Sequence, residues 1–170
     1  MPLLDEEGRP RQYISVRRDI TDQKNNEARL KTLKRAVDAC SEMIFITDAH
    51  GIIQYANPAL YSFCGWSEEG LIGQRANIFN SPRNNESTMA SLKQALESGD
   101  NWVGRMLCRR KTISLSKLSN HPLPIDSFEF WSESSISSVF NDDGSLYGYV
   151  QIFRDISSLI ANEDQQQLEK

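Results

Sequence analysis

A gapless repeat within the chain limits most strongly what this sequence can fold into. An acidic turn with glycine at residues 5–8, an alternating strand and then Arg-Asp-Ile-Thr line up with a second copy that begins at residue 141 and closes with Arg-Asp-Ile-Ser. The offset stays at 136 residues throughout, from Gly8 to Gly144 and from Arg18 to Arg154. Each copy has the pattern of a hairpin turn, a final strand and a helix cap. Agreement of all three at one offset argues against a chance likeness between two short strands.

The repeat predicts that the chain begins with the end of one module and then contains a whole second one. We divide the sequence into a C-terminal hairpin remnant of a preceding module (1–21), a linking and flanking helix (22–41), a complete domain (42–157) and the start of a C-terminal helix (158–170). The strand over residues 12–18 belongs to a sheet whose other strands lie upstream of Met1. We therefore expect that strand to lack its partners, and residues 1–20 to have weak, non-native order.

Charge, apolar run length and cysteine content exclude several classes of protein. The net charge of −4 does not provide the basic surface that nucleic-acid binding needs. Apolar runs such as residues 43–46 fall far short of the roughly 20 residues of a membrane span, and no signal peptide follows Met1. Three widely spaced cysteines indicate neither a disulfide framework nor a metal site, which fits a reducing cytoplasm.

No residue pattern in the chain is typical of catalysis. The two histidines, His50 and His121, fall in a turn and in an irregular stretch, and neither has a nucleophile at a recognisable spacing. A Gly-rich phosphate loop is absent from the sequence as well. We therefore expect no enzymatic activity in this segment.

Hydrophobic periodicity predicts an α+β fold with a five-stranded antiparallel sheet. Helical spacing predicts helices over 22–41 and 85–98, and the capping residues Asn57 and Ser67 predict short helices after them. Period-two alternation predicts strands over 43–48, 52–56, 102–110, 128–140 and 146–156. Because the short helices fall between the second and third strands, they should pack on one face of the sheet, with flanking helices at both ends of the domain. Serines and prolines in residues 111–127 predict a long loop between the third and fourth strands.

Taken together, the motifs of residues 36–157 resemble a PAS domain with its C-terminal PAC motif. The resemblance covers about 120 of the 170 residues. It rests on Ile46-Thr47-Asp48 with Gly51-Ile52, Tyr55-Ala56-Asn57-Pro58-Ala59, Gly65-Trp66-Ser67-Glu68-Glu69, Leu71-Ile72-Gly73, Trp102 with Gly104, Arg109-Arg110-Lys111, Gly148-Tyr149-Val150 and Arg154-Asp155-Ile156-Ser157. It implies a regulatory sensor or relay module of a tandem bacterial signalling protein. Such modules commonly lie upstream of a histidine kinase of a two-component system or of a diguanylate cyclase, and residues 158–170 would begin the signalling helix.

Within that family, Trp102-Val103-Gly104 and the basic triplet are most similar to a branch of flavin-binding redox sensors. That branch implies FAD as the cofactor, with Asn80, Trp102 and Cys108 as the residues nearest to it. Its flavin binders tend to carry an aromatic residue nine positions before the tryptophan and an asparagine before the triplet, where this sequence has Lys93 and Cys108. Compared with an Asn amide, a thiol is a weak hydrogen-bond donor and acceptor. The main interpretation is therefore a module without a tightly held chromophore, and the FAD-binding redox sensor is the alternative.

Two other cofactors of the family are disfavoured by the residues present. The helix over 85–98 contains no histidine to ligate haem, and the Asn-Cys-Arg motif of light-oxygen-voltage domains is replaced by Asn77-Ile78-Phe79-Asn80. Each candidate contact also has a structural explanation. Trp102 can fill the core, Asn80 can serve a turn, and Cys108 can act as a small buried hydrophobe.

The remaining charged and apolar motifs have structural interpretations, and one of them predicts a partner. Asp155 is expected to cap the last helix or pair with Arg154 or a hairpin residue, and the triplet 109–111 to form a solvated face. In the linking helix, an apolar seam with heptad-like spacing consists of Leu30, Leu33, Val37 and Cys40. The resemblance favours a homodimer through this flanking helix, with signals passed as changes in helix packing. In the alternative, the seam packs on the domain's own sheet.

Overall fold

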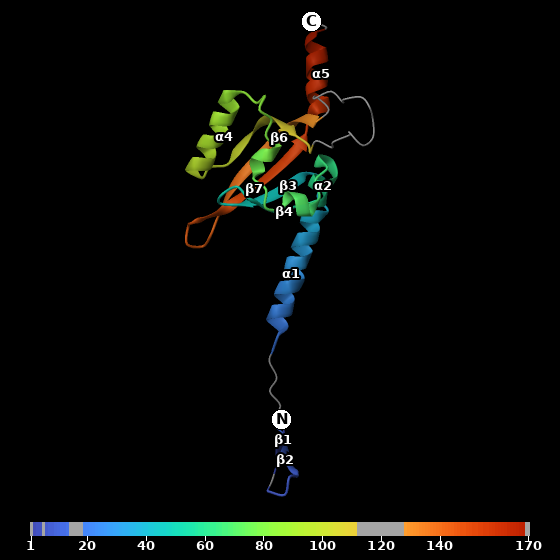
Figure 1. Cartoon of the computed structure of the whole chain (residues 1–170), viewed down its shortest axis with the longest axis vertical. Coiled ribbons are helices and arrows are strands. Elements are labelled where there is room, and N and C mark those ends of the chain that lie inside the picture. Colours follow the sequence, from blue (N-terminus) through green and yellow to red (C-terminus); the bar gives the residue numbers. More distant parts are fainter. Residues whose placement is uncertain (1, 5, 14–18, 112–127, 169–170) are drawn as a thin grey trace. The chain divides into compact units, whose positions relative to one another are not determined.

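The structure is a computed structural model that describes residues 2–4, 6–13, 19–111 and 128–168 (Figure 1). By internal contacts the chain divides into a first unit, Met1–Ala36, and a second unit, Val37–Lys170. Each unit is considered by itself below. The second unit contains all five strands that the sequence predicts for the complete domain.

The second unit is built on a five-stranded antiparallel sheet, which confirms the predicted fold class. Its strands are β3 (Met43–Asp48), β4 (Ile53–Ala56), β5 (Trp102–Arg109), β6 (Glu129–Phe140) and β7 (Leu146–Asp155), in the order β4-β3-β7-β6-β5. Because β3 and β7 are antiparallel neighbours, the start of β3 lies beside the end of β7, with Met43 opposite Phe153. The segments that flank the domain therefore join the sheet at the same end of these two central strands.

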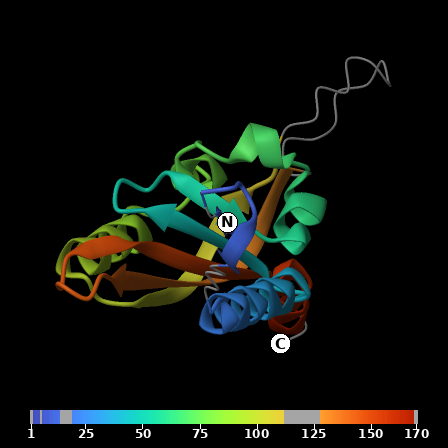
Figure 2. The same cartoon turned by 90° about the horizontal axis from the view of Figure 1, so that it is seen from below.

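Short helices between β4 and β5 cover one face of the sheet. They are α2 (Pro58–Cys64), α3 (Glu68–Leu71), the 3-10 helix η1 (Ala76–Phe79) and α4 (Glu86–Ser98). The side chains of Asn57 and Asn85 cap α2 and α4 by accepting backbone N–H groups, whereas Ser67 at the N-cap of α3 makes no such bond. Figures 1 and 2 place α2 and α4 toward opposite ends of the sheet.

Aromatic side chains fill the space between the sheet and the helices. Phe45 of β3, Phe79 of η1 and Phe153 of β7 are each at most 1% exposed, and their ring centroids lie 5.4 to 5.8 Å apart. Phe130 of β6 extends this cluster, with its centroid 6.1 Å from that of Phe153. The centre of the core is therefore a contiguous group of phenyl rings held by four different elements.

Several element boundaries differ by one to three residues from those predicted, the end of α1 and the start of β6 among them. Helix α1 is Thr21–Asp38, so Cys40 lies beyond its end. The helix stops early because the Cys40 N–H bonds the Val37 carbonyl at 3.2 Å in a tight turn. Strand β6 begins at Glu129, one residue after Phe128, which the alternation had placed in the sheet. The predicted long loop lies, apart from Lys111, outside the described residues. Helix α5 (Ser157–Leu168) follows β7 as expected.

The first unit begins with a hairpin whose register copies that of the β6–β7 hairpin. Its strands are β1 (Pro2–Leu4) and β2 (Pro10–Tyr13). Leu3 lies opposite Gln12, and 136 residues later Val139 lies opposite Gly148, with a register shift at the next residue in both hairpins. The expectation of an unpartnered strand is therefore wrong for residues 12 and 13, because residues before the turn supply a partner. Residues 14–18 lie outside the described ranges.

Candidate functional site

Trp102 lies at the start of β5, with its ring above Gly104 of the same strand. The indole Nε1 donates a hydrogen bond to Ser91 Oγ of α4 at 3.0 Å, and only 7% of the residue is exposed. A Cβ atom on Gly104 would lie 2.5 Å from a ring carbon of Trp102, so a glycine is needed beneath the ring. In this position Trp102 joins β5 to α4 and fills the core.

Cys108 lies near the far end of the same strand and is fully buried. An isolated bridge pairs it with Asn80, and its thiol is hydrogen-bonded with Ser132 and Ser134, whose hydroxyl oxygens lie 2.6 Å apart. Burial raises the pKa of Cys108 to about 11, while the two serines act in the lowering direction. The thiol therefore stays protonated and weakly reactive at neutral pH.

The three predicted contact residues do not converge on one point. Asn80 and Cys108 are neighbours, but Trp102 is six residues from Cys108 along β5, a separation of about 20 Å in a strand. Lys93, the other departure from the flavin-binding pattern, is exposed on α4 and pairs with Glu97 at 3.7 Å.

The space between the sheet and the helices holds buried aromatic side chains and two unpaired polar atoms. Phe79 and Trp102 are among the buried aromatic residues. Two polar atoms in this part of the sheet, Thr47 Oγ1 and Ser138 Oγ, are buried without a hydrogen-bond partner among the described residues. They lie on either side of Tyr149 in one row of the sheet. These hydroxyls are the groups that a small polar ligand could use.

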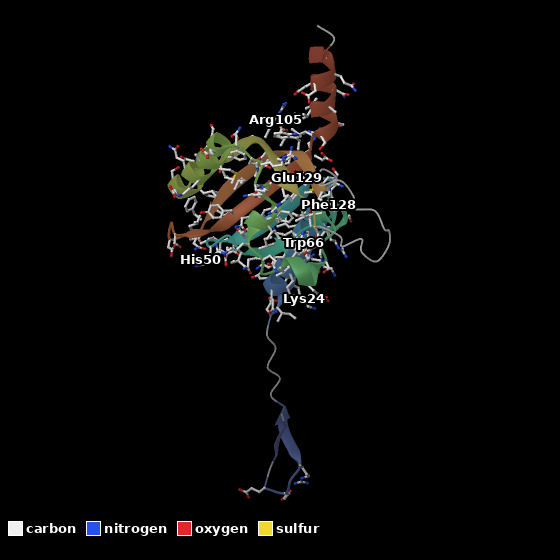
Figure 3. All side chains as sticks on the ribbon, turned by 45° about the horizontal axis from the view of Figure 1, so that its top comes forward. Lys24, His50, Trp66, Arg105, Phe128 and Glu129 are labelled. Atoms are coloured by element: carbon white, nitrogen blue, oxygen red, sulfur yellow. The ribbon has the colours of Figure 1, made fainter. Side chains whose placement is uncertain are left out.

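Helix α4 contains no histidine, and His50 is exposed in the turn between β3 and β4 (Figure 3). His121 lies outside the described residues. Where the structure describes the chain, no three His, Cys, Asp or Glu side chains are grouped to hold a metal ion. None of the described helices is long and apolar enough to cross a membrane.

The N-terminal joint, where α1 meets the sheet, is organised by the fully buried Asn57. Its Oδ1 accepts hydrogen bonds from the N–H groups of Ile44 (3.0 Å) and Leu60 (3.2 Å). Its Nδ2 donates to the carbonyls of Glu42 (2.9 Å) and Val37 (3.4 Å). One amide thus links α1, β3 and α2. The sequence identified Asn57 only as a helix cap, because the other partners are distant in the chain.

A second bond at the N-terminal joint comes from Tyr55 of β4. Its hydroxyl donates to Asp38 Oδ1 at 2.5 Å, at the last residue of α1. Burial, followed by the hydrogen bond and charge of Asp38, raises the pKa of Tyr55 above its usual range. The phenol therefore remains a donor throughout the physiological pH range. No sequence signal had singled out either residue for this contact.

The C-terminal joint, where β7 passes into α5, is organised by Asp155. Its Oδ1 accepts the N–H of Ser157 at 2.9 Å and so caps α5, as the sequence predicted. Ser157 Oγ accepts the N–H of Trp131 on β6 at 3.1 Å, and the Ile156 N–H donates to the Trp131 carbonyl at 2.8 Å. The first turn of α5 is therefore fixed to two strands.

Arg110 connects α2 to the C-terminal joint. Its guanidinium lies 3.9 Å from the ring centroid of Phe63 and 5.5 Å from that of Phe130, and it approaches Asp155 at 3.7 Å. The prediction that residues 109–111 form a solvated face is wrong for Arg110, because its guanidinium lies against the paired rings of Phe63 and Phe130. Lys111 likewise lies over the ring of Trp66, at 4.8 Å.

Helix α5 has one further tie to the sheet. Arg105 of β5, labelled in Figure 3, donates to both carboxylate oxygens of Glu163, at 3.0 and 3.4 Å. Each side chain is 45% exposed, so the pair contributes at most about 1 kcal/mol to stability. Its geometric effect is to orient the second turn of α5 relative to β5.

A groove of about 710 Å³ lies between the two joints. Its wall comprises residues of the N-terminal joint, α2 and the end of β7: Ser41, Glu42, Met43, Ala59, Ser62, Phe63, Phe153, Arg154 and Asp155. A change at this groove would reach the segments that lead to both flanking helices.

Comparisons with known proteins agree with this architecture. The sequence profile of a family described as PAS fold matches residues 31–156. Sensor protein FixL of Bradyrhizobium diazoefficiens is 35% identical over 80 residues, which are 45% of this chain and 16% of that protein. The bacterioopsin transcriptional activator of Halobacterium salinarum is 27% identical over 173 residues, covering 99% of this chain and 22% of the relative. The nitrogen fixation regulatory protein of Klebsiella oxytoca is 29% identical over 121 residues, which cover 71% of this chain and 22% of that protein.

Solved structures share the fold. A PAS domain from Colwellia psychrerythraea is 26% identical and superposes with a TM-score of 0.61 over 76% of this chain and 98% of that one. An RNA-binding light-oxygen-voltage receptor is 20% identical and superposes with a TM-score of 0.67 over 92% of this chain and 40% of the receptor. The chain spans less than a quarter of the length of each of the three curated relatives named above.

Proposed function

The chain belongs to the PAS family, and from that premise we propose that it is a regulatory sensor and relay module of a multidomain signalling protein. The relatives that are named as a sensor protein, a transcriptional activator and a regulatory protein support this class of function. In this proposal the output activity, of histidine kinase or diguanylate cyclase type, belongs to another domain of the parent protein, the segment itself is not an enzyme, and the parent acts in the cytoplasm.

The observation that carries the proposal is the placement of the two joints. Asn57 and Tyr55 fasten the end of α1, and Asp155 fastens the start of α5, beside the adjacent ends of β3 and β7. A shift of one helix relative to the sheet therefore changes the strand pair that holds the other. A relay needs a short mechanical path of this kind between its input and output segments.

The hairpin of the first unit supports a tandem arrangement. Its pairing and register shift match those of β6–β7 at the same offset of 136 residues. We infer that residues 1–21 close a preceding PAS module, that 22–41 link it to the domain 42–157, and that 158–170 begin the helix toward the next domain. On this interpretation α1 is the output helix of one module and the input helix of the next.

For the ligand, we infer a domain without a tightly held chromophore. The phenyl rings packed around Phe79 support this inference. In the alternative, an FAD-binding redox sensor, Asn80, Trp102 and Cys108 are the nearest residues and the rings move on binding. Two measurements distinguish these hypotheses: the visible absorption of the purified protein and the identity of any molecule released on heat denaturation. Stoichiometric flavin would contradict the main proposal on this point.

We further propose a homodimer through the flanking helix, using Leu30, Leu33 and Val37 with Cys40 just beyond the helix end. Leu30 and Leu33 are 67% and 56% exposed, and no residue of α1 is buried. Two exposed leucines one turn apart on a helix are typical of a surface that a partner covers.

The relay is tested by loosening one joint and observing the other. Replacing Tyr55 by Phe removes the hydroxyl that bonds Asp38 and keeps the ring. We expect amide hydrogen exchange in the first turns of α5 to become at least about threefold faster, because the β3–β7 pair couples the joints. Tyr147→Phe is the matched control, since Tyr147 is 55% exposed on the same sheet. Unchanged exchange in α5 with faster exchange confined to α1 would refute the relay.

A further inference from the structure

A hollow of about 230 Å³ lies between the end of α2 and the end of β5, and the described residues of its wall include two cations and no carboxylate. The cations are Arg110 and Lys111. The backbone N–H of Arg110 donates to the Phe128 carbonyl at 2.7 Å, and that of Lys111 donates to the Cys64 carbonyl at 2.9 Å. These two bonds fix both cationic residues at the hollow, in a chain whose net charge is −4.

The guanidinium of Arg110 has hydrogen-bonding capacity that the described residues do not use. Its Nε is buried without a hydrogen-bond partner among them. Its Nη2 lies 3.7 Å from Asp155 Oδ2, which is an ion pair but too long for a hydrogen bond. A guanidinium offers five N–H donors in a planar fork, and a buried donor without an acceptor is unfavourable. A further group with acceptor oxygens would complete this arrangement.

Lys111 brings a second positive charge to the same hollow. Its Nζ lies 4.8 Å from the ring centroid of Trp66, which is labelled in Figure 3. This cation–π contact holds the ammonium near the wall without a hydrogen bond from the ring. An anion in the hollow therefore meets one planar and one tetrahedral cation.

Aromatic rings make much of the remaining wall apolar. The ring centroid of Phe63 lies 3.9 Å from Arg110 Cζ, and this ring packs edge-on against Phe130 with centroids 4.8 Å apart. Phe128, also labelled in Figure 3, contributes a second ring to the wall. Rings beside a cationic fork suit a ligand whose carboxylate is attached to a flat apolar body, because the body loses contact with water while the oxygens meet the cations.

We propose that this hollow binds a small aromatic carboxylate, with its oxygens on Arg110 and Lys111 and its ring against Phe63 and Phe128. One carboxylate of the domain opposes it. Asp155 approaches the same guanidinium from the C-terminal joint, while its Oδ1 accepts the Ser157 N–H. A bound carboxylate therefore competes with Asp155 for Arg110. The site goes beyond the relay proposed above and does not depend on it, because binding is measured directly.

Titration of the full chain with benzoate, followed by two-dimensional NMR, tests the site. We expect saturable shifts around residues 110 and 111 with a dissociation constant below about 1 mM. Benzamide has the same ring without the charge and should bind at least about tenfold more weakly. Inorganic phosphate has the charge without the ring and should also bind at least about tenfold more weakly. No saturation by about 10 mM benzoate, or equal affinity for either of the other two probes, would overturn the proposal.

Substitutions within the basic triplet locate the binding. Lys111→Gln removes one charge at an exposed side chain, and Arg110→Lys keeps the charge but loses the planar fork. Each should weaken benzoate binding at least about fivefold. Arg109→Gln removes the same charge from an exposed neighbour that does not line the hollow, and should change the affinity by less than about twofold. An equal loss in Arg109→Gln, or no loss in Lys111→Gln, would overturn the proposal.

A substitution of the competing carboxylate gives the test a sign. Asp155→Asn keeps a side chain that can cap α5 and removes the negative charge beside Arg110. We expect benzoate to bind at least about threefold more tightly to this variant, because the guanidinium then has no other carboxylate at that distance. Weaker binding would contradict the placement of the ligand on Arg110. Melting temperatures of all variants verify that the domain is folded, and the exchange experiment on Tyr55→Phe decides the relay separately.

Discussion

At the scale of single residues, Asn57 contributes more to this fold than its role as a helix cap suggests. Asn57→Ala removes a fully buried side chain that bonds two backbone N–H groups and two carbonyls, of which the Leu60 N–H and the Val37 carbonyl keep a backbone hydrogen bond. We expect a loss of about 3 kcal/mol or more in the free energy of unfolding, measured with urea. Asn85→Ala, which removes only the cap of α4 at an exposed site, should cost about 1 kcal/mol. Equal losses would show that the extra bonds of Asn57 contribute nothing.

Cys108 gives the folded protein a pH dependence at alkaline pH. Its pKa rises from 9.0 to about 11 on folding, chiefly by burial. Between these values the unfolded chain loses a proton that the folded chain keeps, so stability falls as the pH rises above about 9, by at most about 1.4 kcal/mol per unit. Cys108→Ser keeps a hydrogen-bonding group without a thiol and should show a shallower decline of unfolding free energy from pH 8.5 to 10.5. Identical slopes would contradict this assignment.

The sequence correctly indicated that Trp102 and Cys108 can serve as buried core residues. Trp102 and Cys108 both have buried side chains on β5, as alternation indicates, whereas their separation follows from strand length. Tyr55 and Asp38 escaped prediction because no local pattern connects a strand residue to the end of a helix 17 positions earlier.

At the scale of elements, the pairing of β3 with β7 depends on a close backbone approach at Gly148. A Cβ atom there would overlap with the carbonyl oxygen of Thr47 on β3. Gly148→Ala should therefore push apart the two central strands and lower the unfolding free energy by about 3 kcal/mol or more. Gly144→Ala, in the β6–β7 turn with φ of 81° and no atom within 4 Å of the added carbon, meets only backbone strain of about 1–2 kcal/mol. A smaller drop in melting temperature for Gly148→Ala than for Gly144→Ala would contradict this explanation.

The helical elements were predicted well where they carry their own caps. Helices α2 and α4 each follow an asparagine whose side chain accepts the backbone N–H of the residue three positions later. The signal for the start of each helix therefore lies within a few adjacent residues. The end of helix α1 was predicted three residues too late, because it is set by the Val37–Cys40 turn and by contacts with Asn57 and Tyr55. A helix whose terminus is fixed from outside has no local stop signal.

At the scale of the whole molecule, the two units predict unequal effects of two deletions. Removing residues 1–20 takes away a hairpin that pairs with itself, so the melting temperature should not change measurably. Removing residues 22–40 deletes Asp38 and the Val37 carbonyl, which bond Tyr55 and Asn57 inside the second unit. This second deletion should therefore lower the melting temperature. Circular dichroism on both truncated chains checks this. Unfolding caused by the first deletion would require a different interpretation of the repeat.

The sequence by itself determined the architecture and the family. Period-two and helical spacing, turn glycines and capping asparagines lie within a few residues of one another, and together they specified the elements of an α+β sheet domain. The repeat also determined that residues 5–21 copy the end of the domain, and the shared register of the two hairpins agrees with it.

Only the tertiary structure decided how those elements act on one another. It joined Asn57 to α1, placed the guanidinium of Arg110 against the rings of Phe63 and Phe130, and brought Asn80 beside Cys108. Each of these depends on strand order and register, which bring together residues that are far apart along the chain. Local preference acts through neighbouring residues in sequence, whereas the joints of a relay arise from contacts that exist only after the sheet has formed.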